Sequence, residues 1–334
     1  MVLDINKSIR GFMEIYLINT GEKFGIFSFL HKAKLSSLQQ LSQKTKMPVK
    51  YMKMWCDVAY SFGLLNKEGV KYSLKKNLEP ILGDKKSTQY LGDYIRLMAS
   101  YLGPDMEKQY EYIRGNKKLS FGQHDKEFIE LVTQRGERRG NIYLQNIIPQ
   151  INQLEKGLER GVSLLDFGCG GGSFITTLAK EFKKSKFIGV EIDKTSVDLA
   201  KKLAKKEKLT DRTKFICQSG DEINYLNEFD FVTMNLVLHE INPQLRKIIV
   251  KSIYRALRPG GQIIVLEFPY PEADQEFSDP RFAMGLYDQF YEIIWGTEHI
   301  TGSEQKKLLQ SCKFKNVKRK FVEGGYVLIT ADKK

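Results

Sequence analysis

The chain has 334 residues, of which 42% are apolar, and its formal net charge is +13. This length favours two domains, and this apolar fraction is ample for packed hydrophobic cores, as in a soluble globular protein. No segment approaches the roughly 20 apolar residues that a membrane-spanning helix needs, so a membrane-spanning protein is excluded.

The N-terminal part of the sequence has the pattern of a helical bundle followed by a short hairpin. The spacing of apolar residues predicts three helices and then two strands, over residues 4–19, 36–44, 48–62, 64–65 and 70–74. We expect the first helix to stop at Thr20-Gly21, and the second to open with a capping box formed by Ser36 and Gln39. Together these elements predict a winged helix.

A winged helix is used either to bind DNA or to join two protein chains. A helix that contacts bases carries Arg, Lys, Asn or Gln at its groove-facing positions. The third predicted helix offers only Lys50 and Lys53 before Asp57, and no Arg lies between Lys32 and Lys86. The Arg contact that most often specifies guanine is therefore missing, which favours protein–protein contact over binding of nucleic acid.

The middle of the chain contains the boundary between the two predicted domains. Residues 87–113 form an aromatic-rich helical stretch with an expected break at Gly103-Pro104. Residues 115–118 are the best candidate for a linker, because they are polar and interrupt helical periodicity. We therefore predict a winged-helix domain with a helical extension over residues 1–115 and a second domain over residues 116–334, where a helix is expected from Asp125 to Asn152.

The second domain is organised around the stretch SLLDFGCGGGSF at residues 163–174. A short apolar strand leads into Asp166 and into three alternate glycines, Gly168, Gly170 and Gly172, before helical spacing begins. Glycine permits positive φ and lets a ligand approach bare backbone, and the start of the next helix presents unpaired N–H groups. This strand, turn and helix are therefore predicted to hold a ligand.

Two acidic residues indicate which ligand the turn holds. A pyrophosphate at the helix start disfavours a carboxylate at the strand end, which is where Asp166 stands. S-adenosylmethionine tolerates this carboxylate, because it carries an ammonium and a sulfonium. A second apolar strand, residues 187–190, ends in Glu191, which is placed to accept hydrogen bonds from two ribose hydroxyls. The pair favours S-adenosylmethionine over a dinucleotide.

Strands and helices alternate after Glu191, which predicts a parallel sheet with both faces covered. Further strands are expected at residues 213–218, 229–236 and 261–268, and a C-terminal hairpin at residues 317–330 should add antiparallel strands to the sheet edge. Ligands bind at the carboxyl ends of parallel strands. The residues that follow these apolar runs are Asp221, Asn235, Leu236, His239 and Glu267.

The chain resembles the class I S-adenosylmethionine-dependent methyltransferases over roughly residues 125–334. The resemblance rests on five motifs in the family's order and spacing, LLDFGCGGG (164–172), FIGVEID (187–193), SGDEI (219–223), FDFVTMNLVLHEI (229–241) and LRPGGQIIVLEF (257–268). With the winged helix in front, the whole chain resembles the small-molecule O-methyltransferases of the acetylserotonin, hydroxyindole and caffeate type. This resemblance implies an α/β fold, in which a Rossmann-like seven-stranded methyltransferase sheet follows a mostly helical winged-helix domain.

The resemblance also implies a partner and a set of cofactor-binding residues. Proteins of this family form homodimers through the N-terminal domain, which roofs the partner's active site. The implied cofactor-binding residues are Asp166 near the ammonium, Gly168, Gly170 and Gly172 in the turn, Glu191 at the ribose, Asp221 at the adenine amino group, and Asn235 and Leu236 near the adenine or sulfonium end.

For the chemistry, the resemblance implies that His239 in the segment VLHEIN is the general base for the acceptor's proton. Two family carboxylates steady this histidine, and they correspond here to Glu267, at the end of a strand, and to Glu298. The chain departs from the family pattern at Ile241, where the family has Trp, and at His299, where the family has Arg.

The acceptor pocket is expected on an aromatic helix over residues 281–295. Tyr287, Tyr291 and Trp295 form one row at helical spacing, beside a second row that can face the core. An aromatic lining suits a planar and apolar acceptor, so we expect a small aromatic or quinone-like molecule. Oxygen is the favoured acceptor atom because His239 can serve as the base.

Other interpretations of the sequence stay open at this stage. The enzyme could methylate nitrogen or carbon, or be a family member that does not methylate. A function of another class is a winged-helix DNA-binding regulator that senses S-adenosylmethionine. The four cysteines lie far apart, which argues against a zinc site and favours reduced thiols in the cytoplasm, and no metal is expected.

Overall fold

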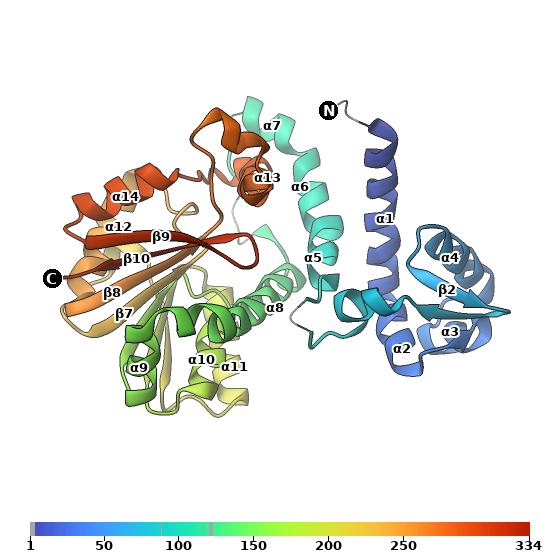
Figure 1. Cartoon of the computed structure of the whole chain (residues 1–334), viewed down its shortest axis with the longest axis horizontal. Helices are drawn as coiled ribbons and strands as arrows, with labels where there is room; N and C mark the ends of the chain where they lie inside the picture. The colour runs from blue at the N-terminus through green and yellow to red at the C-terminus, as the bar shows by residue number, and fades with distance from the viewer. Residues whose placement is uncertain (1–3, 88, 116, 120–122) are drawn as a thin grey trace. The chain divides into compact units, whose positions relative to one another are not determined.

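Figure 1 shows the computed structural model of the chain, which describes residues 4–87, 89–115, 117–119 and 123–334. The chain divides into two compact units, with the division between Asp105 and Met106. The boundary that we expected after residue 115 lies within the second unit, and Asn116 of the expected linker is outside the described residues. Within the described ranges, none of the helices combines the length and the hydropathy that a membrane crossing requires.

The first unit is mostly helical and contains a small antiparallel sheet, in the order β1-β3-β2. Its strands are β1 (Ser36–Ser37), β2 (Leu65–Glu68) and β3 (Lys71–Leu74). Its helices are α1 (Ile5–Lys23), α2 (Ile26–Ala33), α3 (Leu38–Thr45), α4 (Val49–Ser61) and α5 (Gly92–Leu97), with shorter helical segments at Lys76–Leu78, Glu79–Gly83 and Met98–Leu102, while α6 (Gly103–Glu107) spans the division between the units. The helices and the hairpin follow one another in the order on which the winged-helix prediction rests.

Helix α1 continues past the point where the sequence predicts its end. Thr20 stays in the helix, and its hydroxyl donates a hydrogen bond to the carbonyl oxygen of Tyr16 (2.9 Å). Gly21 is required there by packing, because an added Cβ would lie 2.5 Å from the ring of Phe27 and 2.7 Å from the ring of Trp55. The glycine therefore makes room for two aromatic rings instead of ending the helix.

Two other predicted boundaries in the N-terminal part are also shifted. The capping box of α3 lies one residue later than predicted, since Ser37 Oγ accepts from the N–H of Gln40 (3.3 Å) and Gln40 Oε1 accepts from the N–H of Ser37 (2.8 Å). Gly103-Pro104 does not break the helical stretch, because α6 begins at Gly103. Proline is tolerated in the first turn of a helix, where its missing N–H has no partner to lose.

The second unit is built on a sheet with seven strands over the described part of the chain, in the order β6-β5-β4-β7-β8-β10-β9. The strands are β4 (Ser163–Phe167), β5 (Lys186–Glu191), β6 (Thr213–Cys217), β7 (Phe229–Asn235), β8 (Leu257–Glu267), β9 (Lys315–Val322) and β10 (Tyr326–Asp332). The helices are α7 (Gln109–Arg114), α8 (Lys126–Ile142), α9 (Asn152–Arg160), α10 (Ser173–Glu181), α11 (Lys194–Lys206), α12 (Pro243–Ala256), α13 (Ala283–Glu292) and α14 (Gly302–Ser311). Shorter helical segments lie at Tyr143–Ile147, Ile148–Gln150, Gly220–Glu222, Asp274–Ser278, Pro280–Phe282 and Ile293–Trp295.

The order of the strands determines where a ligand can bind. Strands β4 to β8 run parallel, and β10 pairs antiparallel with both β8 and β9, as predicted for the C-terminal hairpin. Strand β4 lies between β5 and β7. From β4 the next two strands, β5 and β6, are added on one side, and the later strands are added on the other side, beginning with β7. The carboxyl end of β4 is therefore the topological switch point, where open α/β sheets bind their ligands.

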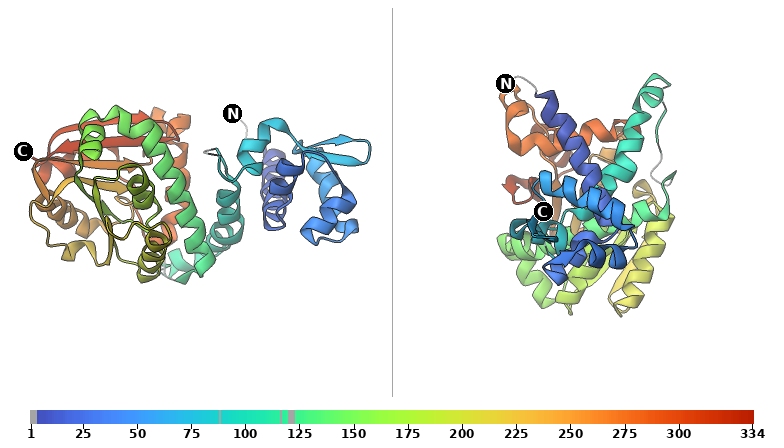
Figure 2. Two further views of the ribbon diagram at one scale, coloured as in Figure 1. Left: turned by 90° about the horizontal axis from the view of Figure 1, so that it is seen from below. Right: turned by 90° about the vertical axis from the view of Figure 1, so that its right-hand side faces the viewer.

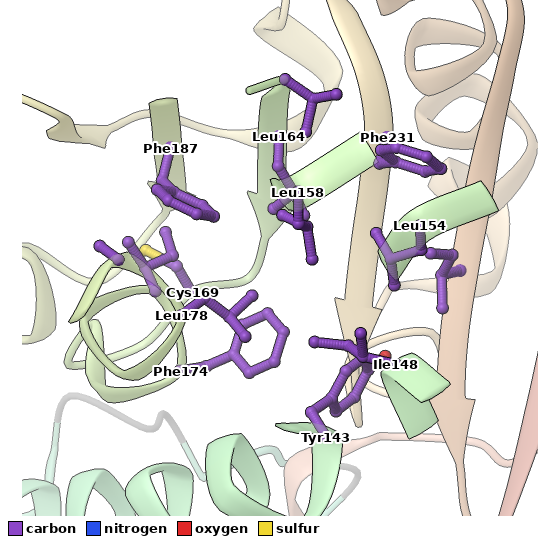
Figure 3. Close-up of a cluster of buried hydrophobic side chains, with 14 of the residues drawn as sticks. Tyr143, Ile148, Leu154, Leu158, Leu164, Cys169, Phe174, Leu178, Phe187 and Phe231 are labelled. Carbon is purple, nitrogen blue, oxygen red and sulfur yellow. The ribbon is translucent and has the colours of Figure 1, made fainter. Parts of the chain in front are cut away.

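Helices cover both faces of this sheet, as Figures 1 and 2 show. Helices α9, α10 and α11 pack on one face, where a buried cluster includes Leu164, Phe174 and Phe231 (Figure 3). Helices α12 and α14 pack on the other face, around a second cluster that includes Val232 and Leu309. This architecture confirms the predicted α/β class with its seven-stranded Rossmann-like sheet, preceded by a mostly helical region.

Two glycine substitutions in α1 test the packing that extends this helix. We expect Gly11→Ala to stabilise the chain by roughly 0.5–1 kcal/mol, because no atom lies within 4 Å of an added Cβ and alanine favours helix. Gly21→Ala should instead destabilise it by about 1–3 kcal/mol, since Phe27 and Trp55 must move. Urea unfolding of both variants measures the difference, and a stabilised Gly21→Ala variant would contradict the observed packing.

Candidate active site

The glycine turn between β4 and α10 has the conformation that its sequence predicts. Gly168, Gly170 and Gly172 have φ angles of +71°, +50° and +74°, which other residues rarely adopt. No atom lies within 4 Å of a Cβ added to Gly170, so the backbone is open to a ligand there. A Cβ on Gly172 would lie 2.7 Å from both Ala200 and Phe215. Gly172 therefore permits close packing under the turn, and it does not line the cavity described next.

A cleft opens at the carboxyl ends of the central strands. One cavity of about 250 Å³ is lined by residues that include Gly168, Gly170, Glu191, Asn235 and Leu236. A second cavity, of about 270 Å³, shares Gly168 and Glu191 with the first and is also lined by Ser219 and Gly220. The two cavities are therefore adjacent along the ends of β4, β5 and β7, and together they are called the cleft here.

Asp166 lies beneath the glycine turn and is only 2% exposed. Its Oδ1 accepts hydrogen bonds from Thr233 Oγ1 (2.6 Å) and Asn235 Nδ2 (3.0 Å), both on the neighbouring strand β7. Burial raises the pKa of Asp166 to about 7, although these hydrogen bonds act in the opposite direction. A carboxyl group with this pKa ionises readily when a cation approaches it.

Asn235 is the clearest sign that the cleft accepts a polar ligand. Its Nδ2 is bound by Asp166, but its Oδ1 is buried and has no hydrogen-bond partner among the described residues. A buried acceptor without a donor costs free energy, so such atoms in native proteins usually face a ligand or water. Asn235 lines the cleft, and a donor group of a bound molecule would satisfy this oxygen.

Glu191 closes the glycine turn from the end of β5. Its Oε2 accepts the backbone N–H of Gly170 (3.0 Å), and its Oε1 accepts those of Ile192 (2.8 Å) and Asp193 (3.0 Å). These bonds fix the carboxylate against the wall of the cleft. Each carboxylate oxygen has two acceptor positions, so Glu191 can still accept hydroxyl groups of a ligand.

The remaining predicted cofactor residues lie at or near the same cleft. Leu236 lines it in a strained conformation, with φ of +58°, which its N–H bond to the carbonyl oxygen of Leu266 (2.8 Å) supports. Asp221 is exposed and does not line either cavity, although it accepts a hydrogen bond from Ser219, which does. Asp221 is therefore next to the cleft but not part of its wall in this structure.

His239 and Glu267 form a buried pair. His239 Nδ1 lies 2.7 Å from Glu267 Oε2, and the side chains are only 3% and 2% exposed. Glu267 Oε1 accepts the backbone N–H groups of Val237 (3.1 Å) and Leu238 (2.8 Å), so the carboxylate holds both the ring and the loop that carries it. The Nε2 atom of His239 is left to face other groups.

The other nitrogen of His239 faces two acidic residues of α13. Its Nε2 lies 3.5 Å from Glu292 Oε2 and 3.6 Å from Asp288 Oδ2. Burial would lower the pKa of His239, but the Glu267 and Glu292 carboxylates outweigh it, and the pKa lies well above its ordinary value. Burial and the charge of Asp288 raise the pKa of Glu292 well above its ordinary value.

Glu298 does not take the position that we predicted for it. Its side chain is 60% exposed and lies near Arg246, with 3.8 Å between the carboxylate and the guanidinium group. Only its backbone N–H contacts His239, at the carbonyl oxygen (3.1 Å). The carboxylates near the Nε2 side of the ring are Asp288 and Glu292, because α13 turns these two side chains inward. The prediction that Glu298 steadies His239 is therefore corrected.

The three residues of the predicted aromatic row, on α13 and the short helical segment Ile293–Trp295, lie in three different environments. Trp295 lines the cleft, and Tyr291 packs against it with ring centroids 5.2 Å apart. Tyr287 is 65% exposed and lines none of the described cavities. In this structure only the C-terminal end of the row reaches the cleft.

Sequence reasoning missed several residues at this site. Asp288 and Glu292 are spaced four apart in an otherwise aromatic segment, and this spacing places them on one face of a helix. Arg139 and Glu240 line the cleft as well. The sequence contains no functional indication for either residue. Arg139 lies in a helix far from the motifs, and Glu240 is distinguished only as the residue that follows His239.

Comparison with known proteins agrees with this geometry. Residues 164–261 match the family described as Methyltransferase domain. Malonyl-[acyl-carrier protein] O-methyltransferase of Priestia megaterium is 28% identical over 142 residues, which are 41% of this chain and 49% of that protein. Demethylmenaquinone methyltransferase of Staphylococcus aureus is 27% identical over 185 residues, which are 52% of this chain and 71% of that protein. The match thus spans about half the length of the first relative.

Solved structures resemble the chain over its whole length. Human N-acetylserotonin methyltransferase, in complex with S-adenosylmethionine, has a TM-score of 0.77 at 18% identity, covering 98% of this chain and 96% of the human one. An O-methyltransferase family protein from Burkholderia thailandensis has a TM-score of 0.77 at 14% identity, covering 100% and 99%. At these identities the likeness shows the fold.

The chain thus carries a class I methyltransferase domain, the class that the glycine turn and the strand-end carboxylates predicted. The predicted cofactor, S-adenosylmethionine, agrees with this family match, and the fold is shared with the human acetylserotonin enzyme, which was solved in complex with it. The cleft fits this cofactor, because it joins the unpartnered amide oxygen of Asn235, an open glycine backbone and the Glu191 carboxylate, while Asp166 lines a small adjoining cavity under the turn.

The buried Asp166 predicts how cofactor binding depends on pH. Since its pKa is about 7, the carboxyl is mostly protonated below that pH in the ligand-free chain. An ammonium nearby favours the ionised form, so affinity should rise as pH increases toward 7 and then level off. Calorimetric titration with S-adenosylhomocysteine measures this. Asp166→Asn should bind more weakly and lose the rise, and an unchanged pH dependence in this variant would contradict the assignment.

Proposed function

We propose that the chain transfers the methyl group of S-adenosylmethionine to an oxygen atom of a small aromatic or quinone-like molecule, with His239 as the proton acceptor. The observation that carries this proposal is the pair of His239 and Glu267 beside the cleft. Glu267 binds Nδ1 and leaves Nε2 on the opposite side of the ring. Val237 and Glu240, which flank the histidine in sequence, both line the cleft.

The residues of the cleft have separate proposed roles in binding the cofactor. Asp166 and the Asn235 amide oxygen would face the ammonium of the methionine part, and the backbone of Gly168 and Gly170 would lie along that part. Glu191 would accept the ribose hydroxyls. Arg139 lines the same cavity, and its charge suits the carboxylate of the methionine part.

The proposed reaction needs alignment and the removal of one proton. The bound cofactor supplies a methyl carbon that is activated by the sulfonium. The chain's own residues hold the acceptor in line with this carbon and exclude water, which can contribute a large part of the rate enhancement. His239 accepts the acceptor's proton at Nε2, and Glu267 stabilises the ring in its charged form through Nδ1. This step requires a neutral His239, and because the neighbouring carboxylates raise the pKa of His239, the neutral fraction increases as the pH rises.

The cleft wall near Trp295 supports an apolar acceptor. Leu119, Ile129 and Val132 line the same cavity as Trp295. Such a lining suits a flat ring better than a charged metabolite. One relative is named for demethylmenaquinone, which supports the quinone-like part of the proposal.

For the first unit we propose self-association and not DNA binding. Helix α1 exposes a row of apolar side chains, including Ile9 (58% exposed) and Phe12 (61%). On α4, Lys53 is bound to Asp57 at 2.5 Å, so one of the two lysines that could contact DNA is already paired. A second copy of the chain could cover the apolar row, as the family resemblance implies.

Variants at His239 and its partners test the proposed base. We expect His239→Ala to lower kcat for methyl transfer by about 10²–10⁴-fold, while the affinity for S-adenosylhomocysteine stays near that of the wild type. Glu267→Gln should also lower kcat, although its amide oxygen can still accept the two backbone N–H groups. Glu298→Gln serves as the matched control, because this side chain is exposed. Wild-type turnover by a folded His239→Ala variant would remove the base assignment.

A charged substitution in α1 tests the proposed dimer. We expect Phe12→Glu to convert a dimer into a monomer in analytical ultracentrifugation, because it places a charge within the exposed apolar row. Val70→Glu, on the turn between β2 and β3, is a control of equal chemistry at a site that is 77% exposed. A wild-type chain that sediments as a monomer, or a dimeric Phe12→Glu variant, would refute this interface.

A further inference from the structure

The side chains of His239 and three other residues come together around one point. Of these four side chains, only His239 has a role in methyl transfer by a general base. They are His239 in the loop after β7, Asp288 and Glu292 one turn apart on α13, and His299 before α14. One nitrogen or oxygen atom from each lies within 4.8 Å of all the others. We call these four residues the His–carboxylate cluster.

The cluster has the distances and the burial of a metal-binding site. The closest pairs are His299 Nε2 to Asp288 Oδ2 at 3.0 Å, and His239 Nε2 to Glu292 Oε2 at 3.5 Å. Ligand atoms at about 2.0–2.2 Å from one ion are typically roughly 3–4 Å apart. The four side chains are between 2% and 17% exposed, so water screens the interactions between their charges only weakly.

Contacts from outside the cluster hold three of its four residues in place. Glu267 binds Nδ1 of His239 and thereby aims Nε2 at the cluster (2.7 Å). Thr297 Oγ1 donates a hydrogen bond to Glu292 Oε2 (3.0 Å), and Gln289 Oε1 accepts the backbone N–H of His299 (2.7 Å). Metal-binding histidines generally have such a partner on the other ring nitrogen, which orients the ring and fixes its tautomer.

The charges in the cluster also call for a cation. The carboxylates of Glu267, Asp288 and Glu292 surround two imidazole rings, and such rings can hold a proton or bind a metal ion. Arg246 does not neutralise these carboxylates. Its guanidinium group instead donates hydrogen bonds to the backbone oxygens of Ile241, His239 and Glu298. Buried carboxylates without a counter-charge are costly, so the cluster holds either protons or a cation.

We propose that His239, Asp288, Glu292 and His299 bind one divalent first-row transition metal ion. Two imidazoles with two carboxylates suit Zn²⁺, Fe²⁺ or Mn²⁺, whereas Mg²⁺ and Ca²⁺ prefer sites made of oxygen atoms alone. The rings of His239 and His299 stack 4.2 Å apart at 11°, so one ring rotates to bring both Nε2 atoms onto the ion. The sequence did not suggest a metal, because its ligands come from three separate segments.

The ion would change the role of His239 in the proposed methyl transfer, and this part rests on that proposed function. Nε2 cannot accept a proton while it binds a metal. A hydroxyl of the acceptor that coordinates the ion loses its proton to water, because the metal lowers the pKa of the hydroxyl. The oxygen then forms its bond to the methyl carbon as the carbon–sulfur bond breaks, which leaves a neutral thioether.

Metal titration of the full-length chain tests the site without any methyl acceptor. The chain is stripped with a chelator, which is then removed, and titrated with Zn²⁺ by calorimetry and with Co²⁺ by visible absorption. We expect one ion per chain and a Co²⁺ spectrum of nitrogen and oxygen ligands. Glu292→Gln and His299→Ala should each weaken binding at least tenfold, whereas the exposed Glu298→Gln should bind as the wild type does.

The outcomes separate this inference from the proposed function. Binding in the wild type that is lost in Glu292→Gln and His299→Ala supports the site, whether or not methyl transfer is found. No binding by the wild type, or equal binding by Glu292→Gln and His299→Ala, overturns it, even if the metal-free chain transfers methyl groups. If either of these results overturns the metal site, the cluster holds protons instead of a metal ion, and His239 keeps its proposed role as the general base.

Discussion

The carboxylate of Glu267 is the contact on which the site depends most. It ends strand β8 and binds the N–H groups of Val237 and Leu238 together with the ring of His239. A single buried group at the end of β8 therefore orients the loop that follows the neighbouring strand β7. Val237 also lines the cofactor cleft, so the same contact shapes the cleft and aims the histidine. Loss of the whole carboxylate would leave the buried N–H groups and the ring of His239 without this partner, which costs about 3–5 kcal/mol.

The cleft combines a carboxylate that is fixed by hydrogen bonds, Glu191, with a buried carboxyl group that can change its charge, Asp166. Glu191 binds the N–H of Gly170 in the glycine turn and the N–H groups of Ile192 and Asp193 after β5, so its carboxylate is fixed before any ligand arrives. Asp166 beneath it is buried and has a pKa of about 7, so its charge can adjust to the ligand. Preorganised hydrogen bonds lower the entropy lost on binding, while the adjustable carboxyl adds a preference for a cationic end. This combination suits a zwitterionic nucleoside better than a phosphate.

Features encoded by short segments were predictable from the sequence. The strand, glycine turn and helix around Gly170 follow from local composition, and Glu191 and Glu267 follow from the rule that strand ends face ligands. The pairing of His239 with Glu267 was implied by the family resemblance, and His239 Nδ1 lies 2.7 Å from Glu267 Oε2. The glycine turn is determined by neighbouring residues within one motif, whereas this pairing joins the end of β8 to the loop after β7.

Features that depend on how a helix is rotated were not predictable. Helix α13 turns Asp288 and Glu292 toward His239 and leaves Tyr287 exposed. The expected partner Glu298 lies instead beside Arg246. Gly172 packs against Ala200 and Phe215, and Gly21 makes room for Phe27, because distant side chains meet there. No local pattern carries such information.

The central claim is that the cleft between Asp166 and Glu191 binds S-adenosylmethionine, and calorimetry with S-adenosylhomocysteine and with a nicotinamide dinucleotide tests it most directly. The account predicts saturable binding of the homocysteine nucleoside at one site and none of the dinucleotide, whereas binding of the dinucleotide alone would contradict it.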